Sequence, residues 1–385
     1  MTNPQPQNLK KEKVNIDLKK SIKILEPHNV KKFALKDPEK ILYDNLYARF
    51  GQRFVDYRKR YERNIKNQDL NELTDYPNTI VMEIVNRCNL ECPFCKQWFR
   101  NDAKKSTLDV HVLDHLFEDF KKNQLNSLMI SASEPLLYKK IDKVLDRAKK
   151  AEIMDVFLFT NGILLNEKNA RMVLDSPITR LFISVDGASK ETYDKIRIPV
   201  AKRLYQTDRL KNLEDNILRF MKLRSELKRE LPLVRLSFLA INENKSEIQK
   251  FINKWTGIVD TVEIQKNITP SFEMNTSNEK ENIDDWYKTL GEQANTKNRI
   301  KDHKKKYSCR EPWSQMSIYS DGSILPCCAT FGRNIPIGSI HNETVKEAWN
   351  GLNMKKIRDG FRQNKPHKVC KACLDHTTTV SNDIF

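Results

Sequence analysis

The chain has 385 residues, of which 39% are hydrophobic and 31% are charged, with 10 glycines and 15 prolines. This composition excludes collagen-like, low-complexity and largely disordered chains, and at about 150 residues per domain the length predicts two to three domains. The net charge of +17 permits binding to nucleic acid, anionic lipid or phosphorylated substrates, but charge alone identifies no partner. No apolar run approaches the ~18 residues that a membrane-spanning helix needs, and none follows the Lys-rich start, so we expect a cytoplasmic protein.

The N-terminal region divides into a polar tail and a helical segment. Residues 1–20 are Lys-rich and lack periodicity, which predicts a mobile tail. Residues 38–68 place apolar side chains at helical spacing, among them Ile41, Phe50 and Tyr61. That spacing predicts a helical layer packed on the rest of the fold, with a substrate- or partner-docking module as the alternative.

Strand-like and helical segments alternate from residue 79 onward. The first of them is β-branched and follows a Pro-Asn turn, which is typical of a buried strand. Six such units predict an α/β fold with a parallel sheet curled into a partial (β/α)6 barrel, whose ligands gather at the carboxyl ends of the strands. The expected strands are Thr79–Val85, Ser127–Ala132, Met154–Thr160, Thr179–Val185, Leu233–Ile241 and Asp260–Gln265, and the expected helices are Leu108–Lys122, Lys139–Lys150, Leu210–Lys228 and Ser246–Trp255.

Three of the eight cysteines stand together just after the first expected strand, as Cys88-x3-Cys92-x2-Cys95. A cytosolic chain is kept reduced, so metal binding is favoured over a disulfide framework. Three thiolates in one loop can hold an iron–sulfur cube and leave its fourth iron open for a small molecule. A structural zinc site is the alternative, but it would need a fourth Cys or His nearby, and none follows.

This loop, with an aromatic residue before its last cysteine, resembles the cluster loop of radical S-adenosylmethionine (SAM) enzymes, and the resemblance extends over about residues 79–268. It implies that Cys88, Cys92 and Cys95 hold a [4Fe-4S] cluster whose open iron chelates the amino and carboxylate groups of SAM. One electron would then cleave SAM to methionine and a 5′-deoxyadenosyl radical, which abstracts a substrate hydrogen. By the same resemblance, Phe94 packs near the adenine.

The second strand of the family usually ends in a Gly-Gly-Glu-Pro stretch, and this chain has Ala132-Ser133-Glu134-Pro135 instead. The resemblance implies that the backbone at Ser133 and the acid of Glu134 meet the SAM amino group. The two added Cβ atoms crowd such a close approach.

Three further positions resemble family contacts to SAM. Asn161 and Ser184 stand where the family commonly touches SAM, and each could instead be a strand-end turn residue that satisfies local backbone. Arg197 resembles an arginine that pairs with the SAM carboxylate, with an ordinary surface arginine as the alternative.

The C-terminal fifth carries the other five cysteines. A hairpin is predicted at Asp321-Gly322, and Thr344 with Glu347 forms a capping box that predicts a helix start. Two separated cysteines and a Cys-x2-Cys pair can make a zinc site. Beside a radical SAM core they resemble the SPASM/twitch extension, which implies one auxiliary [4Fe-4S] cluster. Cys328 is expected to be a buried small hydrophobe or a substitute ligand. The ligands by this resemblance are Cys309, Cys327, Cys370 and Cys373.

These patterns predict four regions. A tail and helical extension covers 1–78, a radical SAM core 79–268, a polar and basic connector 269–306, and a small α+β auxiliary-cluster domain 307–385. The basic cluster at the end of the connector is either a solvated face or a site for an anionic ligand, and it consists of Lys301, His303, Lys304, Lys305 and Lys306.

The resemblance implies an oxidoreductase that abstracts a hydrogen from carbon and oxidises the substrate radical through the auxiliary cluster. We expect a sugar- or cyclitol-type alcohol as substrate, because the single auxiliary cluster resembles that of an aminocyclitol dehydrogenase. Radical modification of a peptide, by epimerisation or cross-linking, is the alternative, and a zinc-bearing nucleic-acid-binding protein is a remote one. The expected partner is a flavodoxin- or ferredoxin-type electron donor, without membrane association. The sequence identifies neither the general base, nor the fate of SAM, nor the oligomeric state.

Overall fold

The computed structural model describes residues 30–66, 73–95, 106–201, 207–266, 307–328 and 334–379. The predicted tail and the whole of the predicted connector, including its basic cluster, lie outside these residues. Among the described residues, no helix has the length and apolar character needed to cross a bilayer. The strands form one sheet in the order β1-β7-β6-β5-β4-β3-β2-β8-β9-β10.

Six neighbouring strands of this sheet, β2 to β7, run parallel to one another. Each begins and ends within three residues of an expected strand, because buried parallel strands are near-continuous apolar runs that the sequence displays clearly. The prediction of a partial (β/α)6 barrel is therefore confirmed. The strands are β2 (Thr79–Met82), β3 (Ser127–Ile130), β4 (Asp155–Thr160), β5 (Arg180–Ser184), β6 (Leu233–Ala240) and β7 (Thr261–Lys266).

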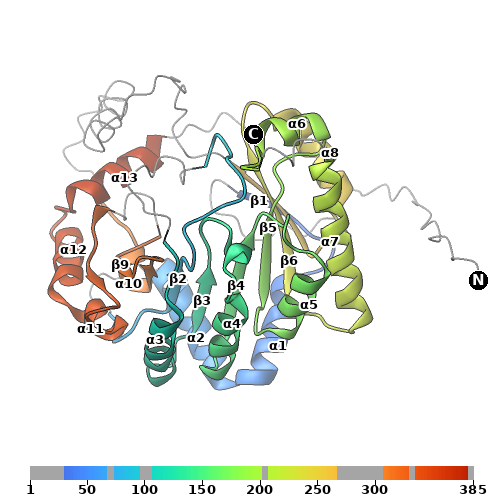
Figure 1. Cartoon of the computed structure of the whole chain (residues 1–385). Coiled ribbons are helices and arrows are strands. Elements are labelled where there is room, and N and C mark those ends of the chain that lie inside the picture. The colour runs from blue at the N-terminus through green and yellow to red at the C-terminus, as the bar shows by residue number, and fades with distance from the viewer. Residues whose placement is uncertain are drawn as a thin grey trace, which may run out of the picture.

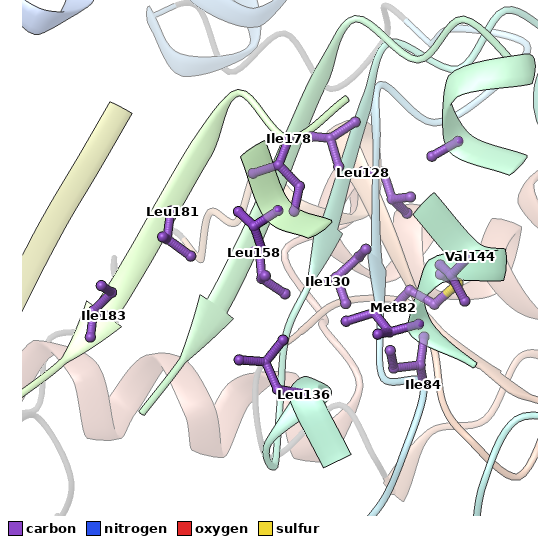
Figure 2. Close-up of a cluster of buried hydrophobic side chains, with 14 of the residues drawn as sticks. Met82, Ile84, Leu128, Ile130, Leu136, Val144, Leu158, Ile178, Leu181 and Ile183 are labelled. Carbon is purple, nitrogen blue, oxygen red and sulfur yellow. The ribbon is translucent and has the colours of Figure 1, made fainter. Parts of the chain in front are cut away.

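Helices connect these strands and pack against one face of the sheet (Figure 1). Leu128, Leu158 and Leu181 project from that face of β3, β4 and β5, and Val144 meets them from a helix in the same fully buried cluster (Figure 2). This cluster is the core that holds the strand ends in place. The helices are α3 (Val110–Lys122), α4 (Ile141–Lys150), α5 (Glu167–Asp175), α6 (Lys190–Ile196), α7 (Arg209–Glu226) and α8 (Ile248–Trp255).

The helices α1 (Pro38–Phe50) and α2 (Gln52–Lys66) pack at the amino-terminal end of the barrel strands. They confirm the predicted helical layer. Buried side chains of these helices, Leu42 and Tyr57 among them, form a second core with residues at the start of the sheet strands. The strand β1 (Val30–Phe33) pairs antiparallel with β7 at the sheet edge and was not expected.

The C-terminal region extends the same sheet. β8 (Gln315–Ile318) pairs parallel with β2, and the predicted hairpin joins it to the antiparallel β9 (Ser323–Leu325). The turn requires Gly322, which has a φ of +87°. The capping box at Thr344 is also present. Figure 1 shows the helices of this region gathered beside β2. The remaining elements are β10 (Gly338–Ser339), α10 (Glu311–Ser314), α11 (Val345–Asn350), α12 (Leu352–Arg362) and α13 (Lys368–Thr379).

Candidate functional site

The loop that follows β2 carries the three cysteines at the carboxyl end of the parallel strands. Cys92 is buried, whereas Cys88 and Cys95 are half-buried. Backbone hydrogen bonds fix the loop, since the Cys95 N–H donates to the carbonyl of Cys92 at 2.9 Å and the Leu90 N–H donates to Cys88 Sγ at 3.4 Å. Burial raises the pKa of the Cys88 thiol to about 12 and also raises that of Cys92. Burial thus disfavours the thiolates, and a bound metal would stabilise them.

Glu134 lies just beyond β3 and connects it to β4. Its fully buried carboxylate accepts hydrogen bonds from Thr160 Oγ1 and from the Asn161 N–H, both at 2.8 Å. It also caps the 3-10 helix η2 (Pro135–Leu137) through the Leu136 N–H. Burial raises the pKa of Glu134, against the lowering effect of these hydrogen bonds. The carboxylate thus fixes the segment that carries Asn161, and its contact with SAM stays a prediction.

Ala132 and Ser133 adopt the left-handed backbone conformation that favours glycine. Their φ angles are +69° and +50°. Such conformations cost about 1–3 kcal/mol at each residue with a Cβ, and they gather at functional sites. The chain therefore keeps the backbone shape of a Gly-Gly pair at these positions while carrying two side chains.

Replacing Ala132 or Ser133 with glycine should raise the free energy of unfolding by up to about 1 kcal/mol. Glycine relieves a left-handed strain of roughly 1–2 kcal/mol, while its greater freedom in the unfolded chain takes back about 0.4–1 kcal/mol. Urea denaturation measures the change. Ala148→Gly, inside α4, is the matched control and should lose at least about 1 kcal/mol. A loss of stability in all three variants would contradict the expected strain.

Asn161 reaches the cysteine loop and also makes a turn. Its Nδ2 donates to Asn89 Oδ1 at 2.7 Å and lies 3.8 Å from Cys88 Sγ, while its Oδ1 accepts from the Ile163 N–H at 3.1 Å. Ser184 ends β5, is half-buried and stands in register with Ser237 of β6. Both residues lie at the expected edge of the sheet, and their contacts with SAM stay predictions.

Arg197 is buried directly beneath the cysteine loop rather than lying on the surface. One terminal nitrogen donates to Cys92 Sγ at 3.6 Å, and the other donates to the carboxylate of Asp186. The guanidinium carbon also lies 5.5 Å from the ring centroid of Phe94. Arg197 therefore connects the end of β5 to two residues of the cysteine loop, and pairing with the SAM carboxylate stays a prediction.

Glu83 was missed at the sequence level. It is buried at the end of β2 and accepts a hydrogen bond from Ser320 Oγ at 2.9 Å, and Ser320 Oγ lies 2.6 Å from Ser106 Oγ. Ser317 of β8 pairs in register with Val81, two residues before Glu83. Ser317 and Glu83 therefore point to the same face of the sheet. Ser317 Oγ is buried and has no hydrogen-bond partner among the described residues. A lone acidic residue inside an apolar strand was the available signal.

Three of the C-terminal cysteines form a second group. Cys309 and Cys370 pack on the edge of the main core, and Cys373 packs near them against Val369. Burial raises the pKa of Cys309 to about 12 and that of Cys370 to about 11, with smaller effects from the neighbouring thiols. These thiols lie close enough to influence one another electrostatically.

Cys328 lies near this second group. Gln315 Nε2 donates to its Sγ at 3.2 Å, and burial raises the pKa of the thiol, with a further contribution from Cys373. The residue as a whole is exposed, while the adjacent Cys327 is half-buried. The sulfur of Cys328 is thus placed as a candidate ligand, and the choice between the two cysteines stays a prediction.

Both thiol groups fit iron–sulfur clusters by their chemistry, because soft thiolates are the ligands these clusters use. Within the described part of the chain, no three Cys, His, Asp or Glu side chains converge closely enough to hold a single metal ion. In a cluster each thiolate binds a different iron, so the ligands need not meet at one point.

Two family models match the chain. The model of the radical SAM superfamily matches residues 82–254, which include the three-cysteine loop. The model of the SPASM iron–sulfur cluster-binding domain matches residues 309–374, which include all five C-terminal cysteines.

Two curated relatives resemble part of the chain. A probable GTP 3′,8-cyclase of Methanococcus maripaludis is 30% identical over 117 residues, which are 30% of this chain and 39% of that protein. An AdoMet-dependent heme synthase of Methanosarcina barkeri is 27% identical over 125 residues, 32% of this chain and 36% of that protein. Each match thus covers well under half of the relative.

Two solved structures resemble the fold. SuiB of Streptococcus suis bound to S-adenosylmethionine has a TM-score of 0.53 at 15% identity, over 78% of this chain and 72% of that chain. The enzyme anSMEcpe with bound AdoMet and a peptide has a TM-score of 0.50 at 17% identity, over 78% and 95% of the two chains. At these identities the likeness establishes the fold.

Proposed function

Because the chain carries a radical SAM domain followed by a SPASM iron–sulfur cluster-binding domain, we propose that it oxidises an alcohol carbon of a sugar- or cyclitol-type substrate. The two domains imply a [4Fe-4S] cluster, SAM and an auxiliary cluster. When bound, these cofactors supply reductive cleavage of SAM to a 5′-deoxyadenosyl radical and an acceptor for the substrate's electron. The proposed ligands are Cys88, Cys92 and Cys95 for the first cluster, and Cys309, Cys370, Cys373 and either Cys327 or Cys328 for the second.

The polar sheet face around Glu83 is the observation that carries the proposal. Ser317 leaves a buried hydroxyl without a partner among the described residues, and such a group costs about 1–3 kcal/mol until a partner is supplied. A substrate hydroxyl fits that requirement. The buried carboxylate of Glu83, when ionised, is an acceptor that can hold or take the proton of such a hydroxyl. This arrangement supports a polar, hydroxylated substrate.

The sheet also joins the two regions of the chain that carry the thiol groups. β8 pairs with β2 over four residues, so the strand that leads to the cysteine loop and the strand that follows Cys309 are direct neighbours. A flavodoxin- or ferredoxin-type donor and a cytoplasmic location belong to the same proposal, because the chemistry needs single electrons and reduced thiols.

The test uses deuterium-labelled polyols with anaerobically reconstituted protein, SAM and a strong reductant. We expect deuterium in 5′-deoxyadenosine and a product two hydrogens lighter by mass spectrometry. Cys370→Ala should still transfer deuterium but should not yield the oxidised product, because only the second thiol group is damaged.

Transfer of deuterium from labelled peptides and from no polyol would contradict the proposed substrate. It would favour radical modification of a peptide, the second candidate. That candidate is supported by the likeness to SuiB of Streptococcus suis bound to its precursor peptide, which has a TM-score of 0.51 at 15% identity over 85% of this chain and 73% of that chain.

A further inference from the structure

We propose that Arg197 and Asp186 set the reduction potential of the cluster bound by the three-cysteine loop. In this pair Arg197 donates a hydrogen bond to the ligand sulfur of Cys92, and Asp186 holds the guanidinium in place. The inference rests on the proposed function only in taking Cys92 as a cluster ligand, and it is independent of the substrate.

Asp186 is fixed by contacts on three sides. Its Oδ1 accepts from the Leu239 N–H of β6 at 2.7 Å, its backbone carbonyl accepts from Asn244 Nδ2 at 2.9 Å, and its Oδ2 accepts from Arg197. Its side chain is buried, and its φ of +63° is left-handed. A non-glycine residue keeps that conformation only where its surroundings determine it, and such positions gather at functional sites.

The contacts of the Arg197 guanidinium hold it against the cysteine loop. Its terminal nitrogens donate to Cys92 Sγ and to Asp186, and its cation lies against the ring of Phe94. Its Nε is buried and has no partner among the described residues. The backbone carbonyl of Arg197 accepts from Arg209, which anchors the end of α6 to α7. The side chain therefore has a fixed direction, toward the sulfur.

A hydrogen bond to a ligand sulfur and a nearby positive charge both stabilise the more negative, reduced state of an iron–sulfur cluster. The site is buried, so the local dielectric is low and both effects are stronger than in water. Asp186 acts in the opposite direction through its negative charge, while it aims the donor. Arg197 thus favours reduction, and Asp186 limits how far that preference goes.

The test measures the midpoint potential of the cluster by EPR-monitored redox titration of the full chain without SAM. Cys95→Ala protein, which keeps only the C-terminal thiol group intact, identifies the signal to subtract. Arg197→Gln should make reduction about tenfold less favourable, a shift of 59 mV to a more negative potential for a one-electron couple. Asp186→Asn should shift the potential in the positive direction, and Arg197→Lys should fall between Arg197→Gln and the wild type.

The matched control is Arg224→Gln, which takes a half-buried arginine from an aspartate, Asp260, at the opposite end of the sheet. It should leave the potential unchanged. Shifts of the same sign in Arg197→Gln and Asp186→Asn, or no shift in either, would overturn the proposal. A wild-type potential with weakened SAM binding in Arg197→Gln would overturn it too, because the arginine would then act on SAM. Failure of the wild type to bind any cluster would instead refute the proposed function.

Discussion

Protein carrying Cys95→Ala is expected to produce no 5′-deoxyadenosine above background when it is supplied with SAM and a strong reductant under anaerobic conditions. The proposed cluster has three protein ligands, all from one loop, so alanine leaves it with two. The Cys95 backbone is held by its N–H bond to the Cys92 carbonyl, which alanine preserves. The loss of activity will therefore report on the missing thiolate rather than on a collapsed loop.

Iron analysis and 5′-deoxyadenosine chromatography check this result together. Iron should fall by one cluster's content, while the C-terminal thiol group keeps its own. Cys328→Ala is the matched control, because it removes a thiol from the C-terminal region and should leave SAM cleavage intact. Full activity in Cys95→Ala, or zinc in place of iron in the wild type, would contradict the assignment.

Arg180→Met is expected to lower the free energy of unfolding by about 3–5 kcal/mol, the typical effect of removing one partner from a buried ion pair. Arg180 Nε lies 3.3 Å from Asp155 Oδ1, and the terminal nitrogens donate to both oxygens of Glu39. Asp155 is 1% exposed, so its carboxylate would stay buried without the cation. Urea denaturation measures the change, with Arg171→Met as the control.

The control removes an arginine of the same size from an exposed pair with Glu167 on α5, so it should change stability by no more than about 0.5 kcal/mol. An equal effect of the two variants would show that burial of Asp155 carries no penalty.

The pH dependence of the free energy of unfolding gives a second measurement. Burial raises the pKa of Glu39, but Arg180 overrides that effect and the net shift is downward. The pair's stabilisation is therefore present above the unfolded-state pKa of Glu39 and is lost as pH falls through its folded-state pKa, and this dependence should weaken in Arg180→Met.

The barrel could be predicted from the sequence because parallel strands covered by helices are long apolar runs. The same reasoning missed α5 and α6, which have only 9 and 7 residues and so show too few turns for a periodic pattern. It also missed β1, whose four residues Val30–Phe33 contain two lysines. A short edge strand needs little apolar surface, so its pattern is weak.

The sequence identifies candidate residues for the site, but it does not reveal the contacts among them. The cysteine spacing identifies the loop, since all three thiols lie between residues 88 and 95. The contacts of Arg197 join residues 105 and 11 positions away, and no local pattern encodes such pairs. Likewise, nothing in the sequence around Glu134 reveals that its carboxylate accepts a hydrogen bond from the backbone N–H of Asn161.

The pairing of β8 with β2 also makes the C-terminal region part of the main sheet. The backbone N–H and C=O groups along one side of β2 are covered by a strand that comes more than 230 positions later in the chain. A chain ending before β8 would present that side as an uncovered, apolar sheet edge, the kind of surface on which polypeptides aggregate. The strand β8 and the barrel therefore share one continuous sheet, so removing the C-terminal region would leave the barrel with an unpaired edge at β2.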